Sequence, residues 1–136
     1  MEIVQHSIGG LPAFLLYLAT SLTFLVLFLS IYIWMTPYRE LELIREGNVA
    51  AGVSLAGTIL GFVIPLAHAV AQSANLADMA VWGVIALIVQ LLVFFVVTRL
   101  IPDIARDIPA GKIAPGILLG AVSLATGILN AACMTY

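Results

Sequence analysis

Residues 47–61 read GNVAAGVSLAGTILG, a segment that is apolar, rich in small residues and free of charge. A weaker copy follows at residues 111–125, which read GKIAPGILLGAVSLA. At a shift of 64 residues five positions are identical: Gly47, Ala50, Gly52, Leu55 and Leu60 recur as Gly111, Ala114, Gly116, Leu119 and Leu124. We therefore expect the chain to use one pair of helices twice.

The composition excludes an ordinary soluble domain. Hydrophobic residues make up 63% of the chain and charged residues only 9%, against about 25% charged in a soluble domain. Ten of the twelve charged side chains lie in residues 39–46 and 99–112, which leaves long uncharged runs. A lipid bilayer is the solvent that fits, and nothing in a net charge of −2 indicates nucleic acid. The single cysteine, Cys133, excludes an internal disulfide and a cysteine-based metal site.

Four apolar runs are long enough to cross the hydrocarbon core, which takes about 20 helical residues. We expect an all-α membrane protein, one integral domain over residues 1–136, with four transmembrane helices arranged as two parallel two-helix repeats. The repeat halves cover about residues 12–71 and 79–134, because a repeat with an even number of spans returns to the same side of the membrane. The four spans cover about residues 12–35, 48–70, 79–100 and 113–134.

The positive residues predict the orientation. All five Lys and Arg side chains lie in or beside two charged turns, residues 36–47 and 101–112. The positive-inside rule places both turns in the cytoplasm and both termini on the outer side. The first eleven residues have no Lys or Arg and no small-residue cleavage site, so we expect the first apolar run to be retained rather than removed as a signal peptide.

One set of polar side chains falls near the middle of the membrane, with one member in each span. Its functional interpretation is a narrow path for an ion or small solute. Its structural interpretation is a set of hydrogen bonds between helices, worth roughly 0.6 kcal/mol each, or hydroxyl bonds to the same helix. The set consists of Thr23, Thr58, Gln90 and Ser123. The amide of Gln90 has no local backbone partner of that kind and is the informative member.

A second set lies toward the outer ends of the spans. Ionisable groups inside a span are costly and need a reason, and His68 is the only such candidate by these boundaries. The alternatives are an outward-facing pocket that binds a proton or ligand, and a histidine that simply reaches interfacial water. The set consists of Tyr17, His68, Asp78 and Asn130.

Small residues at a spacing of four predict close helix packing, because they let two backbones approach in lipid. Each row can pack inside the four-helix unit or against another copy, and we expect self-association. The packing candidates are Gly52, Gly57, Gly61, Gly116, Gly120 and Gly127. We find no Ser/His/Asp set, paired membrane carboxylates or phosphate loop, so we expect neither an enzyme nor a cofactor or metal site.

The charged turn that leads into Glu46-Gly47-Asn48-Val49-Ala50-Ala51, followed by Gly57 and Gly61, resembles the YjfL-like family of uncharacterised bacterial inner-membrane proteins. The resemblance covers nearly the whole chain and implies four spans, an internal two-span repeat and an inner-membrane location. The family's repeat favours Gly-Asn-x-Ala, whereas the second copy here has Lys112 in place of the asparagine. The family has no agreed activity, so the resemblance implies no mechanism.

Two classes of function stay open. The first is a compact membrane protein that acts through self-association or as a component of an envelope complex, with the lipid bilayer, further copies and an envelope protein as partners. The second is a small channel or transporter for an ion or solute. An enzyme acting on a lipid or quinone would need a polar pocket that the sequence does not indicate.

Overall fold

A computed structural model describes residues 1–134, and its regular structure is entirely helical. Four of the helices are long and apolar enough to cross a membrane. The elements are α1 (Glu2–Gly9), α2 (Leu11–Met35), α3 (Glu40–Arg45), α4 (Val49–Gln72), α5 (Leu76–Leu100), α6 (Ile104–Asp107) and α7 (Ile113–Cys133). The all-α membrane fold predicted from the apolar runs is confirmed.

Side-chain caps set two helix starts. The Asn48 side chain accepts a hydrogen bond from the Ala51 N–H at 3.0 Å, so α4 begins directly after it. Asn75 accepts from the Asp78 N–H at 2.9 Å in the same way, and α5 therefore begins at Leu76. Helix α5 thus begins three residues before the expected span of about residues 79–100, because the Asn75 cap starts it there.

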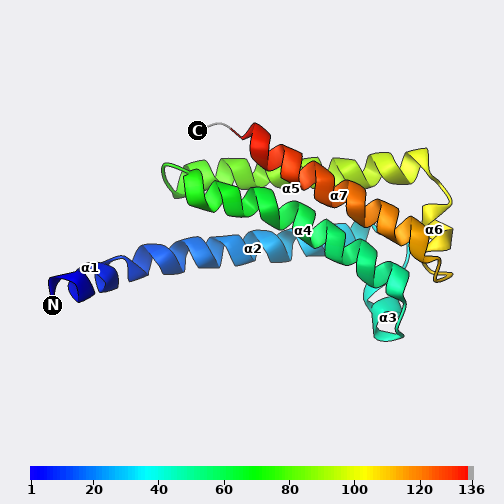
Figure 1. Cartoon of the computed structure of the whole chain (residues 1–136), viewed down its shortest axis with the longest axis horizontal. Coiled ribbons are helices and arrows are strands. Elements are labelled where there is room, and N and C mark those ends of the chain that lie inside the picture. Colours follow the sequence, from blue (N-terminus) through cyan, green and yellow to red (C-terminus); the bar gives the residue numbers. More distant parts are fainter. Residues whose placement is uncertain (135–136) are drawn as a thin grey trace.

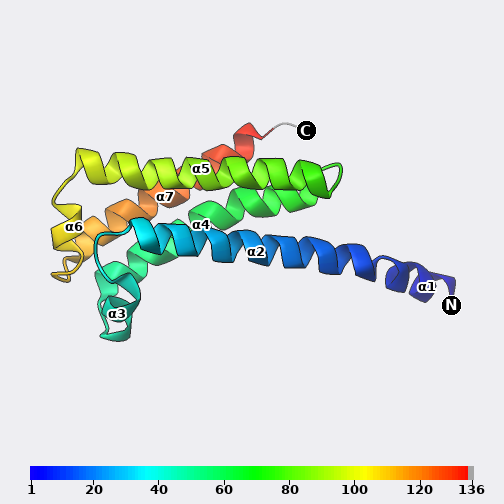
Figure 2. The same ribbon diagram turned by 180° about the vertical axis from the view of Figure 1, so that it is seen from behind.

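The long helices form two layers of two. Figure 1 shows α4 and α7 side by side on the near face, and Figure 2 shows α2 and α5 on the opposite face. Helix α5 packs on both α4 and α7, whereas α2 packs on α4 and α5. The first part of α2 extends away from the bundle together with α1 (Figure 1).

The seam between α4 and α7 is built on glycine. A Cβ atom added at Gly57 would fall on the backbone of Gly120, and one at Gly127 would fall on the backbone of Gly61. Gly116 lies against Ala50 in the same manner. These contacts advance in the same order along both helices, so α4 and α7 run parallel. Parallel repeats require this direction, although the duplication itself stays a prediction.

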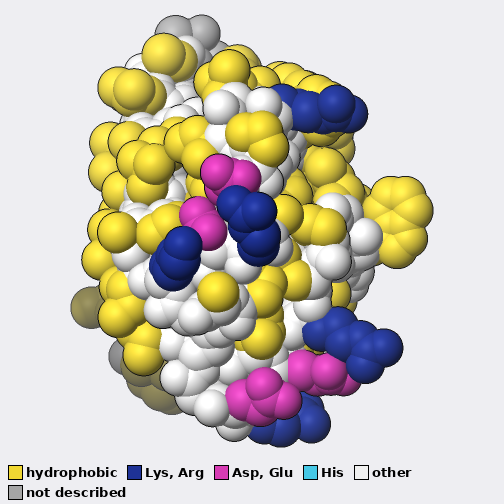
Figure 3. Space-filling model, turned by 90° about the vertical axis from the view of Figure 1, so that its right-hand side faces the viewer, with side chains coloured by type: hydrophobic (Ala, Val, Ile, Leu, Met, Phe, Trp, Pro, Cys, Tyr) yellow, Lys and Arg dark blue, Asp and Glu magenta, His cyan; other side chains and the backbone are white. Residues whose placement is uncertain are grey.

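Both charged turns lie at one end of the molecule, called the charged end below (Figure 1). Figure 3 looks onto this end and shows basic and acidic side chains gathered among hydrophobic ones. Each turn enters its long helix through a glycine with positive φ, Gly47 at 87° and Gly111 at 81°. An L side chain rarely adopts this conformation, so both turns need glycine at the same place in the 64-residue register.

Candidate functional site

Gln90 joins three helices at mid-membrane depth. Its Nε2 atom on α5 donates to the carbonyl oxygen of Gly61 on α4 at 2.9 Å and to that of Ser123 on α7 at 3.0 Å. The Gln90 and Ser123 side chains are both 1% exposed. The Gln90 amide is thus hydrogen-bonded to both α4 and α7 and connects them. This supports the structural interpretation of the mid-membrane set.

The other two members of that set lie differently. Thr58 is buried on α4, and its hydroxyl donates to the carbonyl oxygen of Ser54 at 2.9 Å. Thr23 is exposed on α2, where its hydroxyl donates to the carbonyl oxygen of Ala19 at 2.8 Å. The structure therefore gathers Thr58, Gln90 and Ser123 in the interior and leaves Thr23 on the lipid-facing surface.

The residues of the outer polar set interact mainly with neighbouring parts of the chain. The Asp78 carboxylate accepts from the Ala74 N–H at 3.0 Å and so belongs to the turn between α4 and α5. Tyr17 packs partly buried against the hydrophobic core, and His68 is half-buried and has interaction partners of its own. The Nδ2 atom of Asn130 is buried without a hydrogen-bond partner.

Five of the six predicted packing glycines, Gly57, Gly61, Gly116, Gly120 and Gly127, contact the facing helix inside the chain. Gly52 is different, because a Cβ there would meet nothing within 4 Å. Both small-residue rows are thus used for one internal seam, and their glycines are not available to a second copy.

The strongest concentration of buried polar groups lies at the charged end, and the sequence pattern does not indicate it. We call it the polar cluster. Helix α2, the turn after it, α3 and α4 each contribute, and α3 contacts α4. Its members are Tyr32 on α2, Thr36 and Tyr38 in the turn, Glu40 at the start of α3, and Ser54 and Thr58 on α4.

Glu40 is the centre of this cluster. Its side chain is 0% exposed, as are those of Tyr32 and Ser54. Burial raises the pKa of the Glu40 carboxyl to about 8, since a charge is poorly solvated away from water. Burial also raises the pKa of Tyr38 above its usual range, with the nearby Tyr32 and Glu40 adding to the effect and the Ser54 hydroxyl opposing it.

The neighbouring charges do not neutralise Glu40. Arg39 is exposed and forms an ion pair with Glu42 at 3.4 Å, on the solvent side of the turn. At the second charged turn, Lys112 pairs with Asp107 at 3.4 Å. The cluster thus holds one carboxyl group among hydroxyl oxygens. This donor set suits a proton or a hard cation, because such cations take oxygen ligands.

The burial of Glu40 is not expected from its place in the chain, because a glutamate in a charged turn is normally exposed. The 64-residue register does contain a signal for it. Position 40 corresponds to Ile104, an apolar residue in the second charged turn, and both residues are 0% exposed. An isoleucine at the equivalent place indicates that the position faces the interior.

Asn48 connects the two charged turns. Its Nδ2 atom donates to the carbonyl oxygen of Ile108 at 2.9 Å and to that of Pro109 at 3.3 Å, while its Oδ1 atom caps α4. The side chain of the equivalent Lys112 instead forms the ion pair with Asp107 described above. The asparagine of the Gly-Asn motif therefore serves once in this chain, as a tie from the first turn to the second.

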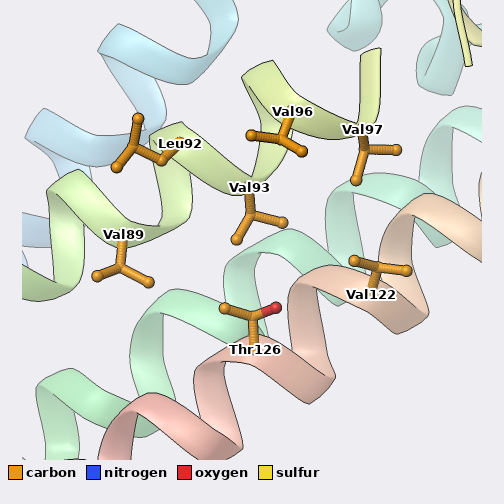
Figure 4. A pocket seen from close by; sticks show the side chains of 7 residues that line it. All are labelled: Val89, Leu92, Val93, Val96, Val97, Val122 and Thr126. Carbon is orange, nitrogen blue, oxygen red and sulfur yellow. The ribbon is translucent and has the colours of Figure 1, made fainter. Parts of the chain in front are cut away.

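An apolar pocket of about 340 Å³ opens between α5 and α7. Figure 4 shows its lining, with Val122 and Thr126 on α7 facing the valine-rich side of α5. No charged side chain lines it, so it has no group that would select a polar ligand. In a membrane, lipid chains suit such a surface.

Comparisons with known proteins agree with this architecture. The family model described as Domain of Unknown Function (DUF350) matches residues 6–134. The inner membrane protein YjfL of Escherichia coli (strain K12) is 40% identical over 132 residues, which is 97% of this chain and 100% of that protein. The transmembrane protein YshE of Bacillus subtilis (strain 168) is 30% identical over 118 residues, 85% of this chain and 88% of that protein. No solved structure matches the chain.

Proposed function

Because the chain belongs to the DUF350 family, as its YjfL-like sequence pattern predicts, we propose that it works in the bacterial inner membrane by pairing with a second copy of itself through α2. The observation behind this proposal is the exposure of α2. Of its 25 residues only Phe28 and Tyr32 are buried, although α2 is as long as the other spans. The proposal assigns no catalytic step.

The outward side of α2 has the chemistry of a helix-packing face. Thr20, Thr23, Leu27 and Ser30 follow one another at spacings of three and four residues, which places them in one stripe along the helix. The three hydroxyls donate to backbone carbonyls four residues earlier at 2.7–2.8 Å and keep their acceptor lone pairs. Small polar residues of this kind support helix association in lipid.

The shape of this surface also favours a facing helix. Two hollows follow the stripe, one of about 240 Å³ around Thr20 and Thr23 and one of about 450 Å³ reaching Ser30. A second α2 related by a two-fold axis would fill both hollows at once, since the same surface meets itself in such a dimer. An envelope protein of another kind is the alternative occupant.

The test is cysteine crosslinking in membranes, with Cys133 replaced by serine to remove the native thiol. Thr23→Cys on the stripe should form a disulfide-linked dimer. Leu18→Cys is the matched control, because Leu18 is exposed at 44% but lies roughly 140° around the helix from Thr23. A dimer with Leu18→Cys and none with Thr23→Cys would contradict the proposal. A crosslink to a different protein at Thr23 would favour the envelope partner.

Orientation enters the same proposal. We infer that the charged end faces the cytoplasm, because all five basic residues lie at its two turns or beside them. Both termini then lie on the outer side. Labelling of cysteines introduced at Arg45 and Arg106 with a membrane-impermeant reagent should give equal protection in intact cells, and opposite accessibility of the two would contradict this orientation.

A small channel or transporter is the second candidate, and the polar cluster is what favours it. A buried carboxyl beside hydroxyl groups is the type of site at which a coupling ion can bind. The expected result is ion flux in liposomes containing the pure protein, reduced by Glu40→Gln. Liposomes that stay tight on both sides of neutral pH would remove this candidate.

A further inference from the structure

The polar cluster has more buried oxygen atoms than protein partners. Both carboxylate oxygens of Glu40 are buried without a hydrogen-bond partner within residues 1–134. The buried hydroxyls of Tyr32, Tyr38 and Ser54 make no hydrogen bond of good geometry there, although they lie near one another and near the hydroxyls of Thr36 and Thr58. A buried polar group that is left unsatisfied destabilises a fold. Five such atoms in one place indicate a site that is completed by something from outside the chain.

We propose that Glu40, Tyr32, Tyr38 and Ser54 form a binding site for one dehydrated monovalent cation, such as sodium or potassium. The ligands are oxygen atoms only, which hard cations prefer. One carboxylate balances one positive charge, whereas a divalent ion would leave a net charge buried. No group of three His, Cys, Asp or Glu side chains that would suit a divalent or transition metal occurs in the part of the chain that the structure describes.

Two further hydroxyl groups are oriented so that their oxygen atoms can act as ligands of the cation. Thr36 donates its proton to the carbonyl oxygen of Tyr32 at 2.7 Å, and Thr58 donates to that of Ser54 at 2.9 Å. Their oxygen atoms therefore offer only lone pairs to the interior of the cluster, which a cation can use and a second hydrogen-bond acceptor cannot.

The surroundings admit and favour a positive charge. An open pocket of about 410 Å³ lies beside the cluster, lined by Ile33 at the end of α2 and by residues 36–42. These include Glu40 and also Arg39, whose charge is balanced by its ion pair with Glu42. Helix α2 ends at Met35, so the partial negative charge of its last carbonyl groups lies at the same end of the molecule.

The second half of the chain argues against a purely structural role. In the 64-residue register, the four proposed ligands Tyr32, Tyr38, Glu40 and Ser54 correspond to Val96, Pro102, Ile104 and Leu118. Of these four residues only Ile104 is fully buried like its counterpart, whereas Val96 and Leu118 are 48% and 45% exposed. The fold thus accepts an apolar side chain at the buried place of Glu40 and does not demand a carboxyl group there. This inference is independent of pairing through α2.

The experiment measures thermal unfolding of the full chain in detergent at alkaline pH, in sodium or potassium chloride and in choline chloride at the same ionic strength. Choline is too large for a buried site and serves as the reference. A bound cation should raise the unfolding midpoint by an amount that grows with the logarithm of its concentration. Retention of radioactive sodium by the purified protein, at one ion per chain, is the direct measurement.

Two variants locate the effect. Glu40→Gln should abolish the difference between sodium and choline, whereas Glu42→Gln, the exposed neighbour, should keep it. Ser54→Ala removes one ligand and should raise the half-saturating salt concentration about tenfold, which corresponds to about 1.4 kcal/mol. It also provides the decisive measurement if Glu40→Gln does not fold.

Equal midpoints of the unchanged protein in sodium, potassium and choline would overturn the proposal. So would a cation response that persists in Glu40→Gln or an unchanged half-saturation in Ser54→Ala. A response to magnesium that exceeds the response to sodium would show a divalent site instead.

Discussion

Phe28 of α2 stacks on Phe62 of α4 with ring centroids 4.5 Å apart, whereas the equivalent Leu92 and Thr126 make no such contact and both line an open pocket. The two pairs occupy the same places in the 64-residue register, in the seam between the first and second helix of each half. The first seam is filled with rings, and the neighbouring Tyr32 packs edge-on against Phe94 of α5. The second seam leaves about 340 Å³ of apolar space.

The comparison shows that one helix pair can be held together in two ways. The second half relies on glycine contacts with α4 and on the Gln90 amide, so its own seam need not be filled. The first half fills its seam with rings and places a buried carboxyl at the end of it. Among the described residues the buried carboxyl group thus lies in the first half, at the end of the ring-filled seam.

The largest expected effect separates two glycines at the same register position. Gly116→Leu should prevent folding, at a cost above about 4 kcal/mol, because its side chain would meet the Ala50 backbone. Gly52→Leu should be tolerated, since a Cβ atom added at Gly52 has no neighbour within 4 Å. The thermal unfolding midpoint, together with elution as a single species in mild detergent, tests both variants. Equal behaviour of the two variants would break the comparison.

The next effect is a pH dependence confined to the first half. The Glu40 pKa rises from 4.5 unfolded to about 8 folded, so folding takes up a proton between these values. The protonated form therefore stabilises the fold fully below about pH 4.5, and this stability is lost as the pH rises through about 8. The gap corresponds to as much as about 5 kcal/mol.

Unfolding midpoints measured in choline buffer across this range should fall with pH in the unchanged protein. Glu40→Ile, which imports the residue of the second half, should remove this slope because isoleucine cannot ionise. A slope that survives in Glu40→Ile would assign the pH dependence to other groups.

The smallest effect exchanges the two seams. Phe62→Thr imports the residue at position 126 and should cost about 3 kcal/mol, because the Phe28 ring loses its stacking partner. Thr126→Phe fills the pocket and should change stability by less than about 1 kcal/mol. Unfolding midpoints of both variants test the asymmetry, and a cost at position 126 as large as at position 62 would refute it.

The spans followed from the sequence because a run of apolar residues in lipid has few alternatives to a helix. The glycine rows indicated contact but not its partner, since Gly57 fits a neighbouring copy as well as it fits α7. Only three-dimensional packing distinguishes Gly52 from Gly116, which look alike in the repeat. Glu40 could not be located from its neighbours in the chain, because its burial depends on the contact between α3 and α4.

The glycine seam between α4 and α7 has a consequence for biosynthesis. Helices α4 and α7 are separated in the chain by a turn, the whole of α5 and the second charged turn. Helix α4 is therefore inserted well before α7 is synthesised. During that interval the flat face of α4 is open to lipid and to any other helix with small residues. Insertion and quality-control factors that shield such faces would act on this chain in the window before α7 emerges from the ribosome.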